Sequence, residues 1–421
     1  MIRVWYSTES FADYIIDHTI LKSIPNLSKK KMYESDANNP NNFHTLPDHI
    51  KKILYLDAPD LIVEYNSEPI FSIEISTEAG TGHNAFQRFA RIAAAVENNV
   101  PAIYIYPEAA IITRRDSEPK WDKINPLVLK ALESVMQIYN IPALLFYYPT
   151  DFRRYQDAAQ SPNIGTKGLL YENNFRYAGC PQSTDSQMQK LFNILNIIIK
   201  TSEDFGVKEA RSRLMKIKDV RDIRDDMVFQ YVEKGGNENM SPLTATQVIP
   251  TKYLLNYLKK NESSVYKIGE LLRSRPETLV YEVNASFRGD PYPGALSAID
   301  YLKCREGETF EDRKYNLVLV WGKITINEDE QTLIVNCDKG TSINDFITDI
   351  KSCLSKNLLT KDYSQLKKSE IPRYYMQARY GSMYSKNKHI RVYSYFADAV
   401  LFSDGELWRD AWEKRKLQRK S

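Results

Sequence analysis

The chain has 421 residues, of which 43% are hydrophobic and 26% are charged, and its formal net charge is +3. This composition indicates a globular protein with a full core. The length favours two or three domains over one, and the balanced charge neither requires nor excludes a polyanionic partner. The four cysteines form no CxxC pair, and no apolar run reaches the length of a membrane span. We therefore expect a cytoplasmic protein with no zinc ribbon, no disulfide framework and no membrane partner.

The first half of the sequence alternates between helix and strand patterns. In chain order these are a helix at 48–56, strands at 60–65 and 70–76, a helix at 84–99, a strand at 102–107, a helix at 126–140 and a strand at 143–148. A helix after each later strand predicts a mixed α/β sheet. Residues 149–183 are rich in Pro, Gly, Asn and aromatic residues and predict a long loop or insertion, which a helix at 185–200 follows.

The organisation changes near residue 200. A charged stretch at 208–226 predicts a solvated helix or a connector. Three later segments have strand patterns, at 278–283, 315–324 and 332–337. The expected fold class is therefore α/β, with a mixed-sheet domain over residues 1–200 and an additional α+β domain over residues 201–421.

The two strands at 60–65 and 70–76 predict a hairpin, because a turn signal at 66–68 separates them. A three-residue loop there places Tyr65 opposite Pro69. The same register, continued along the ladder, places Asp60 opposite Glu74. Two carboxylates from neighbouring strands are thus expected to face each other.

One face of this hairpin is apolar, and the other is mostly polar. The polar face carries Asp60, Ile62, Glu64, Ser72, Glu74 and Ser76. We expect the apolar face to pack inward and the polar face to stay open for chemistry. Opposed Cβ atoms lie about 4.5 to 5.5 Å apart, so two carboxylates repel unless a cation lies between them, and such hard oxygen ligands suit Mg²⁺. The alternative is a solvated acidic pair on the surface.

The helix that follows Glu74 carries basic residues beside its apolar stripe. Gln87 and Arg91 lie one turn apart, with Arg88 beside them. Because this helix begins just after the strand of Glu74, its first turns can overlook the carboxylates. Arginines and a helix N-terminus suit a phosphate group. The alternative is an amphipathic surface helix with solubilising arginines.

Taken together, these residues resemble the PD-(D/E)xK nuclease superfamily, best known from restriction endonucleases. The resemblance covers residues 45–107. It includes Pro59 and Asp60, the hairpin, Glu74 of "IEIS", the helix with Gln87 and the strand "AIYIYP". Their order of helix, strand, strand, helix and strand is similar to the core of that family. The resemblance implies a restriction-endonuclease-like core in which Asp60 and Glu74 bind Mg²⁺.

Ser76 stands where the family has its lysine, two residues after Glu74. Glu78, Gln87 or Arg88 is then the candidate to replace that lysine, and the set of candidate catalytic residues is Asp60, Glu74, Ser76, Gln87 and Arg88. The resemblance implies a Mg²⁺-dependent endodeoxyribonuclease of the type II restriction class, which cuts double-stranded DNA as a homodimer. The alternatives are a non-catalytic DNA-binding or defence-complex protein that keeps the nuclease fold, and a nuclease directed at RNA or at particular structures.

Basic and aromatic residues alternate near the C-terminus. Lys and Arg neutralise phosphates, and tyrosines stack on bases or form hydrogen bonds. Across the whole chain, the candidate DNA-binding residues are Arg91, Arg288, Arg305, Arg379, Lys388 and Arg391. We accordingly assign DNA recognition, dimerisation or both to residues 201–421. The alternatives are a tyrosine-rich β core with a basic tail and, around Arg288 and Arg305, an ordinary connection between a strand and a helix.

Overall fold

The structure is a computed structural model with two compact units. It describes residues 1–32, 46–54, 58–76, 86–107, 109–112, 120–123, 125–148, 171–233, 243–260, 273–283, 291–309, 312–320, 322–336, 396–401 and 407–408. The first unit comprises Met1–Glu34 and Leu46–Glu238, and the second comprises Ser35–Thr45 and Asn239–Ser421. The boundary therefore follows residue 238, whereas the sequence analysis placed it at residue 200.

A mixed six-stranded sheet forms the centre of the first unit. The sequence predicts a mixed sheet and four of these strands, but not the two that precede residue 32. The strand order in the sheet is β2-β1-β3-β4-β5-β8. The strands are β1 (Ile2–Tyr6), β2 (Ser28–Lys31), β3 (Leu61–Tyr65), β4 (Glu68–Ile75), β5 (Ala102–Pro107) and β8 (Ala143–Tyr148). β3 is antiparallel to both β1 and β4, whereas β4, β5 and β8 run parallel to one another and β2 runs parallel to β1.

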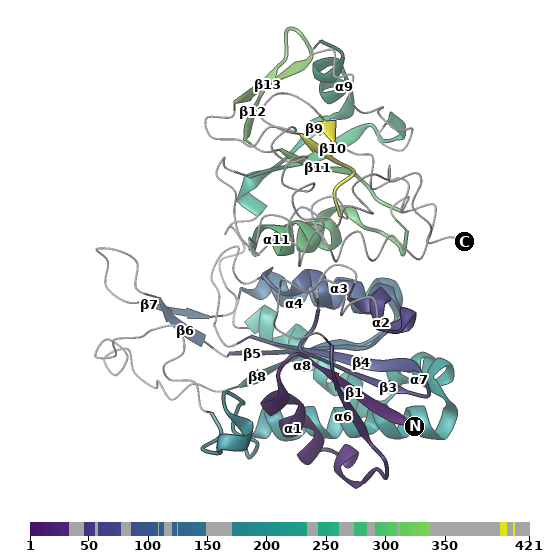
Figure 1. Cartoon of the computed structure of the whole chain (residues 1–421). Helices are drawn as coiled ribbons and strands as arrows, with labels where there is room; N and C mark the ends of the chain where they lie inside the picture. Colours follow the sequence, from purple (N-terminus) through teal and green to yellow (C-terminus); the bar gives the residue numbers. More distant parts are fainter. Residues whose placement is uncertain are drawn as a thin grey trace, which may run out of the picture. The chain divides into compact units, whose positions relative to one another are not determined.

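Helices cover both faces of this sheet (Figure 1). One face is covered by α2 (Asp48–Ile53), α3 (Phe89–Glu97) and α4 (Pro126–Tyr139). The opposite face is covered by α1 (Glu9–Asp17), α6 (Ser186–Phe205) and α7 (Val207–Leu214). This arrangement explains why β5 and β8 are buried along their whole length, since strands between two helical layers meet no solvent.

The charged stretch after residue 200 belongs to the first unit because it packs there. α8 (Lys218–Glu233) contacts α4 and β8, and the backbone N–H of Leu145 in β8 donates to the Met227 sulfur at 3.2 Å. α7 contacts β4, and Arg211 donates to the carbonyl of Pro69 at 2.8 Å. α7 and α8 are thus helices of the α/β unit with exposed charged residues, as the first of the two predicted alternatives has it, and not a connector.

Local sequence signals set the ends of several helices. Asn125 caps α4 by accepting from the N–H of Leu127, and Asn140 ends that helix in the left-handed region with a φ of 53°. The helix expected at 84–99 is shorter, because α3 begins at Phe89. The remaining short elements of the first unit are the 3₁₀ turns Ile20–Ser23 and Phe175–Tyr177 and the hairpin of β6 (Ala109–Ile112) and β7 (Lys120–Lys123).

The turn between β3 and β4 differs from the predicted three-residue loop. It has two residues, Asn66 and Ser67, with φ of 50° and 65°, and it pairs Tyr65 with Glu68. A register shift between Val63 and Glu64 then compensates for the shorter loop. The ladder beyond the shift pairs Leu61 with Ile73, so the predicted juxtaposition of Asp60 and Glu74 is retained.

This turn makes a prediction about stability. Ser67→Gly is expected to raise the free energy of unfolding by about 0.5 to 1 kcal/mol, because a left-handed conformation is unfavourable for serine and accessible to glycine. Urea unfolding of the full chain measures the change. Ser67→Ala is the matched control and should not stabilise the protein. A glycine variant no more stable than the alanine variant would contradict the explanation.

The second unit contains a five-stranded mixed sheet, in the order β15-β14-β11-β10-β9. The strands are β9 (Thr246–Pro250), β10 (Glu277–Glu282), β11 (Asn316–Val320), β14 (Ala399–Leu401) and β15 (Leu407–Trp408). Its other elements are the 3₁₀ turn Leu243–Ala245, α9 (Thr251–Lys260), α11 (Pro291–Ile299), the π-helical turn Asp300–Cys304 and the hairpin of β12 (Lys323–Asn327) and β13 (Thr332–Asn336). The prediction of a single strand at 315–324 is wrong, because β11 ends at Val320 and a separate strand, β12, begins at Lys323.

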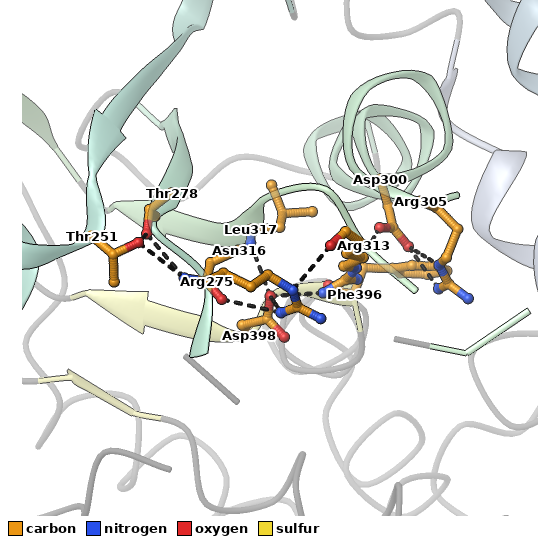
Figure 2. A network of polar contacts seen from close by, with 10 residues as sticks. All are labelled: Thr251, Arg275, Thr278, Asp300, Arg305, Arg313, Asn316, Leu317, Phe396 and Asp398. Carbon is orange, nitrogen blue, oxygen red and sulfur yellow. Dashed lines mark hydrogen bonds and ion pairs between the residues drawn. The ribbon is translucent and has the colours of Figure 1, made fainter. Parts of the chain in front are cut away.

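A buried network of charged and polar side chains ties this second unit together (Figure 2). Arg313 forms ion pairs with Asp300 at 2.7 Å and with Asp398 at 2.9 Å, and all three side chains are inaccessible to solvent. Arg305 pairs with Asp300 at 2.7 Å, and the N–H of Leu317 donates to Asp398 at 2.9 Å. The network joins the π-helical turn, the start of β11 and the residues before β14.

Candidate acidic site on the central sheet

Asp60 and Glu74 lie side by side at one end of the β3–β4 hairpin. The N–H of Asp60 donates to the carbonyl of Ile73 at 3.0 Å, and the N–H of Ile75 donates to the Asp60 carboxylate at 2.8 Å. This second bond holds the Asp60 side chain against the backbone of β4, one residue beyond Glu74. The ladder that pairs Leu61 with Ile73, continued by one residue, places Asp60 opposite Glu74, as the hairpin pattern predicts.

The polar face of the hairpin is not open to solvent, contrary to expectation. Glu64, Ser72, Glu74 and Ser76 are all buried, with Glu74 only 2% exposed. α2 and α3 cover this face, and both contact β4. The reason is that β4 runs parallel to β5, and the crossover between parallel strands places a helix over the sheet.

Two arginines converge on Glu74. Arg91 of α3 lies 2.5 Å from the Glu74 carboxylate oxygen Oε1, and Arg88, just before α3, lies 3.2 Å from the same atom. The Arg91 side chain is 9% exposed and that of Arg88 is 26% exposed. Half-buried Gln87 directly precedes Arg88. Arg91 was expected to contact DNA, and in the structure it is a buried partner of Glu74.

Tyrosines surround the position where the resembled family has its lysine. The N–H of Ser76 donates to the carbonyl of Ile105 at 2.9 Å, and the Tyr148 hydroxyl donates to the carbonyl of Ser76 at 2.9 Å. Tyr104 pairs with Glu74 in the register of β4 and β5. Burial raises the pKa of the Tyr104 phenol well above its usual range, and so do the charges of Tyr106 and Glu74, whereas Arg88 and a hydrogen bond with Ser76 oppose that rise.

Sequence reasoning missed Tyr104 as part of this site. The alternation in "AIYIYP" was a usable signal, because it places Tyr104 and Tyr106 on the same face of β5. The two rings are in edge contact, with centroids 5.2 Å apart. A phenol held protonated in this way donates hydrogen bonds and does not act as a base near neutral pH.

A second buried glutamate, Glu64, lies on β3. It is four residues from Asp60, which corresponds to about 13 Å at a rise of about 3.3 Å per strand residue. Arg3 of β1 contacts one of its carboxylate oxygens at 3.0 Å, and His49 of α2 contacts the other at 2.6 Å. The Arg3 side chain is 21% exposed and that of Glu64 is 3% exposed. The sequence analysis did not anticipate this ion pair, because its partners are distant in the chain.

The donor chemistry of Asp60 and Glu74 fits Mg²⁺. Magnesium takes one or two carboxylates and keeps several waters, so it does not need a larger protein cage. The described part of the chain holds no group of three or more His, Cys, Asp or Glu side chains that could bind a metal. The Asp60 carboxylate is fixed by the Ile75 N–H, and the arginines on Glu74 compete with a cation for that side chain.

Of the other candidate DNA-binding residues, the structure describes only Arg305. Arg305 is 6% exposed and its guanidinium is bound to Asp300, so a structural role accounts for it. The remaining candidates lie outside the described residues; they are Arg288, Arg379, Lys388 and Arg391. Among the described helices, none is both long enough and apolar enough to cross a membrane.

Comparison of the chain with models of protein families, with curated proteins and with solved structures found no match. The class of protein to which this chain belongs is therefore described by its fold and its candidate site alone. The chain is an α/β protein with a mixed six-stranded sheet, an acidic pair on neighbouring strands and two arginines on one of those carboxylates.

Proposed function

We propose that this chain is a Mg²⁺-dependent endodeoxyribonuclease of the type II restriction class, with a PD-(D/E)xK-like core. The observation that carries the proposal is the position of Asp60, directly before β3, next to Glu74 of β4, with Arg88 and Arg91 on the Glu74 carboxylate. The strand order adds support. β3 and β4 form an antiparallel hairpin, α3 follows, and β5 pairs parallel with β4. This order is similar to that of the resembled family.

In this proposal Asp60 and Glu74 hold Mg²⁺, which when bound supplies Lewis-acid activation of the scissile phosphate and of the attacking water. Arg88 and Gln87 bind and orient the phosphate at the edge of the site. Tyr104 keeps its proton, because its pKa is raised, and so does not act as a general base. Ser76 cannot supply the positive charge of the family's lysine, so the nearby guanidinium of Arg88 supplies it.

The proposed substrate is double-stranded DNA, and the proposed assembly is a homodimer. One acidic pair serves one scissile phosphate, so a double-strand break requires two copies of the site. The second unit is assigned to DNA recognition, dimerisation or both.

A non-catalytic DNA-binding or defence-complex protein with a nuclease fold is the second candidate. The specific observation in its favour is that two arginines occupy the Glu74 carboxylate while no lysine is present at position 76. Such a protein would bind DNA without cutting it.

Digestion of unmethylated phage DNA distinguishes the two candidates. The purified chain with Mg²⁺ is expected to give discrete bands, whereas Ca²⁺ or a chelator gives none. Discrete bands support a site-specific endonuclease. Intact DNA in Mg²⁺ and Mn²⁺, with a clear mobility shift in Ca²⁺, would support the second candidate. Parallel incubation with RNA and with single-stranded DNA identifies the preferred nucleic acid.

A further inference from the structure

The charged side chains that the structure describes at the site on the central sheet nearly balance one another. Asp60 and Glu74 contribute two carboxylates, and Arg88 and Arg91 contribute two guanidiniums. A divalent cation added alone gives this group an excess of positive charge in a buried environment. A phosphate added alone gives it an excess of negative charge. The two ligands together leave a smaller excess of charge than the cation does alone, and the cation and the phosphate also attract each other, so electrostatics favours their joint binding.

The two arginines hold Glu74 differently. Arg91 lies within α3 and donates a hydrogen bond to Glu74 at 2.5 Å, and its side chain is almost completely buried. The Arg88 Nε contacts the same oxygen at 3.2 Å without hydrogen-bond geometry. The Arg88 side chain is about a quarter exposed and precedes the helix. Arg88 is thus the partner that a ligand from solvent can draw away.

We propose that Arg88 makes Mg²⁺ binding depend on DNA binding. This inference rests on the proposed function. In the DNA-free protein Arg88 neutralises Glu74 and lowers its affinity for a divalent cation. A phosphodiester group that enters the site draws the Arg88 guanidinium to itself, because phosphate is a strong acceptor for arginine. Glu74 then keeps Arg91 and becomes a ligand for the cation together with Asp60.

This coupling must act in both directions. If DNA raises the affinity for the cation, the cation raises the affinity for DNA by the same factor. Coupling of this kind is typically about 5-fold to 150-fold. Removal of the Arg88 charge should therefore strengthen cation binding without DNA and weaken the dependence on DNA.

Calorimetric titration with Ca²⁺ tests the inference, since Ca²⁺ binds oxygen ligands and does not support cleavage in the proposed enzyme. The probe is fragmented phage DNA, and titration of Ca²⁺ into DNA alone is subtracted. For the wild-type chain we expect DNA to raise the Ca²⁺ affinity at least about 10-fold. For Arg88→Gln we expect an affinity about 10-fold above the wild-type value without DNA, and little further gain when DNA is added.

Arg3→Gln is the matched control. The Arg3–Glu64 pair has a length of 3.0 Å and side-chain exposures of 21% and 3%, close to the 3.2 Å, 26% and 2% of the Arg88–Glu74 pair. It lies on the same sheet and away from Asp60. The control should keep the wild-type Ca²⁺ affinities with and without DNA, and thermal melts verify that each variant is folded.

Two outcomes would overturn the inference, and they separate it from the proposed function. Equal Ca²⁺ affinity of wild type and Arg88→Gln without DNA, together with Mg²⁺-dependent cleavage that requires Asp60, would remove the coupling role of Arg88 and leave the nuclease assignment intact. Absence of Ca²⁺ binding in every variant and state, together with absence of cleavage, would overturn both.

Discussion

Asp60→Asn is expected to reduce Mg²⁺-dependent DNA cleavage by at least about 10³-fold. The asparagine oxygen can still accept from the Ile75 N–H, which donates to the Asp60 carboxylate at 2.8 Å, so the local backbone is preserved. The negative charge is lost, and with it a ligand that Mg²⁺ prefers. Metal activation contributes several kcal/mol to the reaction barrier, and each 1.36 kcal/mol is worth about a factor of ten in rate.

The measurement is the initial rate of plasmid cleavage, with DNA binding in the presence of a chelator determined beside it. Without a divalent cation, DNA binding should change little, because the candidate contacts for recognition lie elsewhere in the chain. Glu64→Gln is the control, because Glu64 is a carboxylate on the same polar face of the hairpin, is buried beside Arg3 and lies outside the proposed site. It should keep its cleavage rate per folded molecule. Normal cleavage by Asp60→Asn would remove this acidic pair from the mechanism.

The second large effect concerns the stability of the second unit. Asp398→Asn is expected to lower its free energy of unfolding by about 3 kcal/mol, because it leaves buried arginines with one carboxylate fewer. Asp398 lies 2.9 Å from Arg313 and 3.6 Å from Arg275, and it is inaccessible to solvent. The asparagine can still accept from the N–H of Leu317, so the change tests the charge more than the shape.

Differential scanning calorimetry of the full chain measures this effect. The two units can unfold separately, so we expect one transition to move to a lower temperature. Asp222→Asn is the control, because Asp222 forms an exposed ion pair with Lys218 on α8 and such pairs contribute little. Equal melting profiles of Asp398→Asn and Asp222→Asn would show that the buried network does not stabilise the second unit.

The proposed enzyme separates cutting from recognition. The acidic site lies within the first unit, and the substitution at Asp398 acts on the second. A folded first unit with a destabilised second unit should retain the acidic pair and lose affinity for DNA. The two predictions therefore test different halves of the proposal.

The sequence by itself determined the parts of the site that depend on local pattern. Alternation of side chains and the turn between the early strands place Asp60 opposite Glu74, and the structure has this register at the site. The predicted loop is one residue too long. The actual turn has two residues, both left-handed, and a register shift further along the ladder restores the predicted pairing. Sequence periodicity does not reveal such a shift. The mixed sheet and the helix at α4 also follow from local periodicity.

Only the tertiary structure decided what lies over that hairpin. An alternating pattern states on which face Glu74 lies, but not that α3 covers this face and brings Arg88 and Arg91 to its carboxylate. The sequence also does not reveal that Arg305 is buried: its partner Asp300 is only five residues away, but the packing of the second unit encloses both side chains. The sequence alone does not reveal whether a charged residue is buried or which residue it pairs with, because both depend on how the folded chain packs around it.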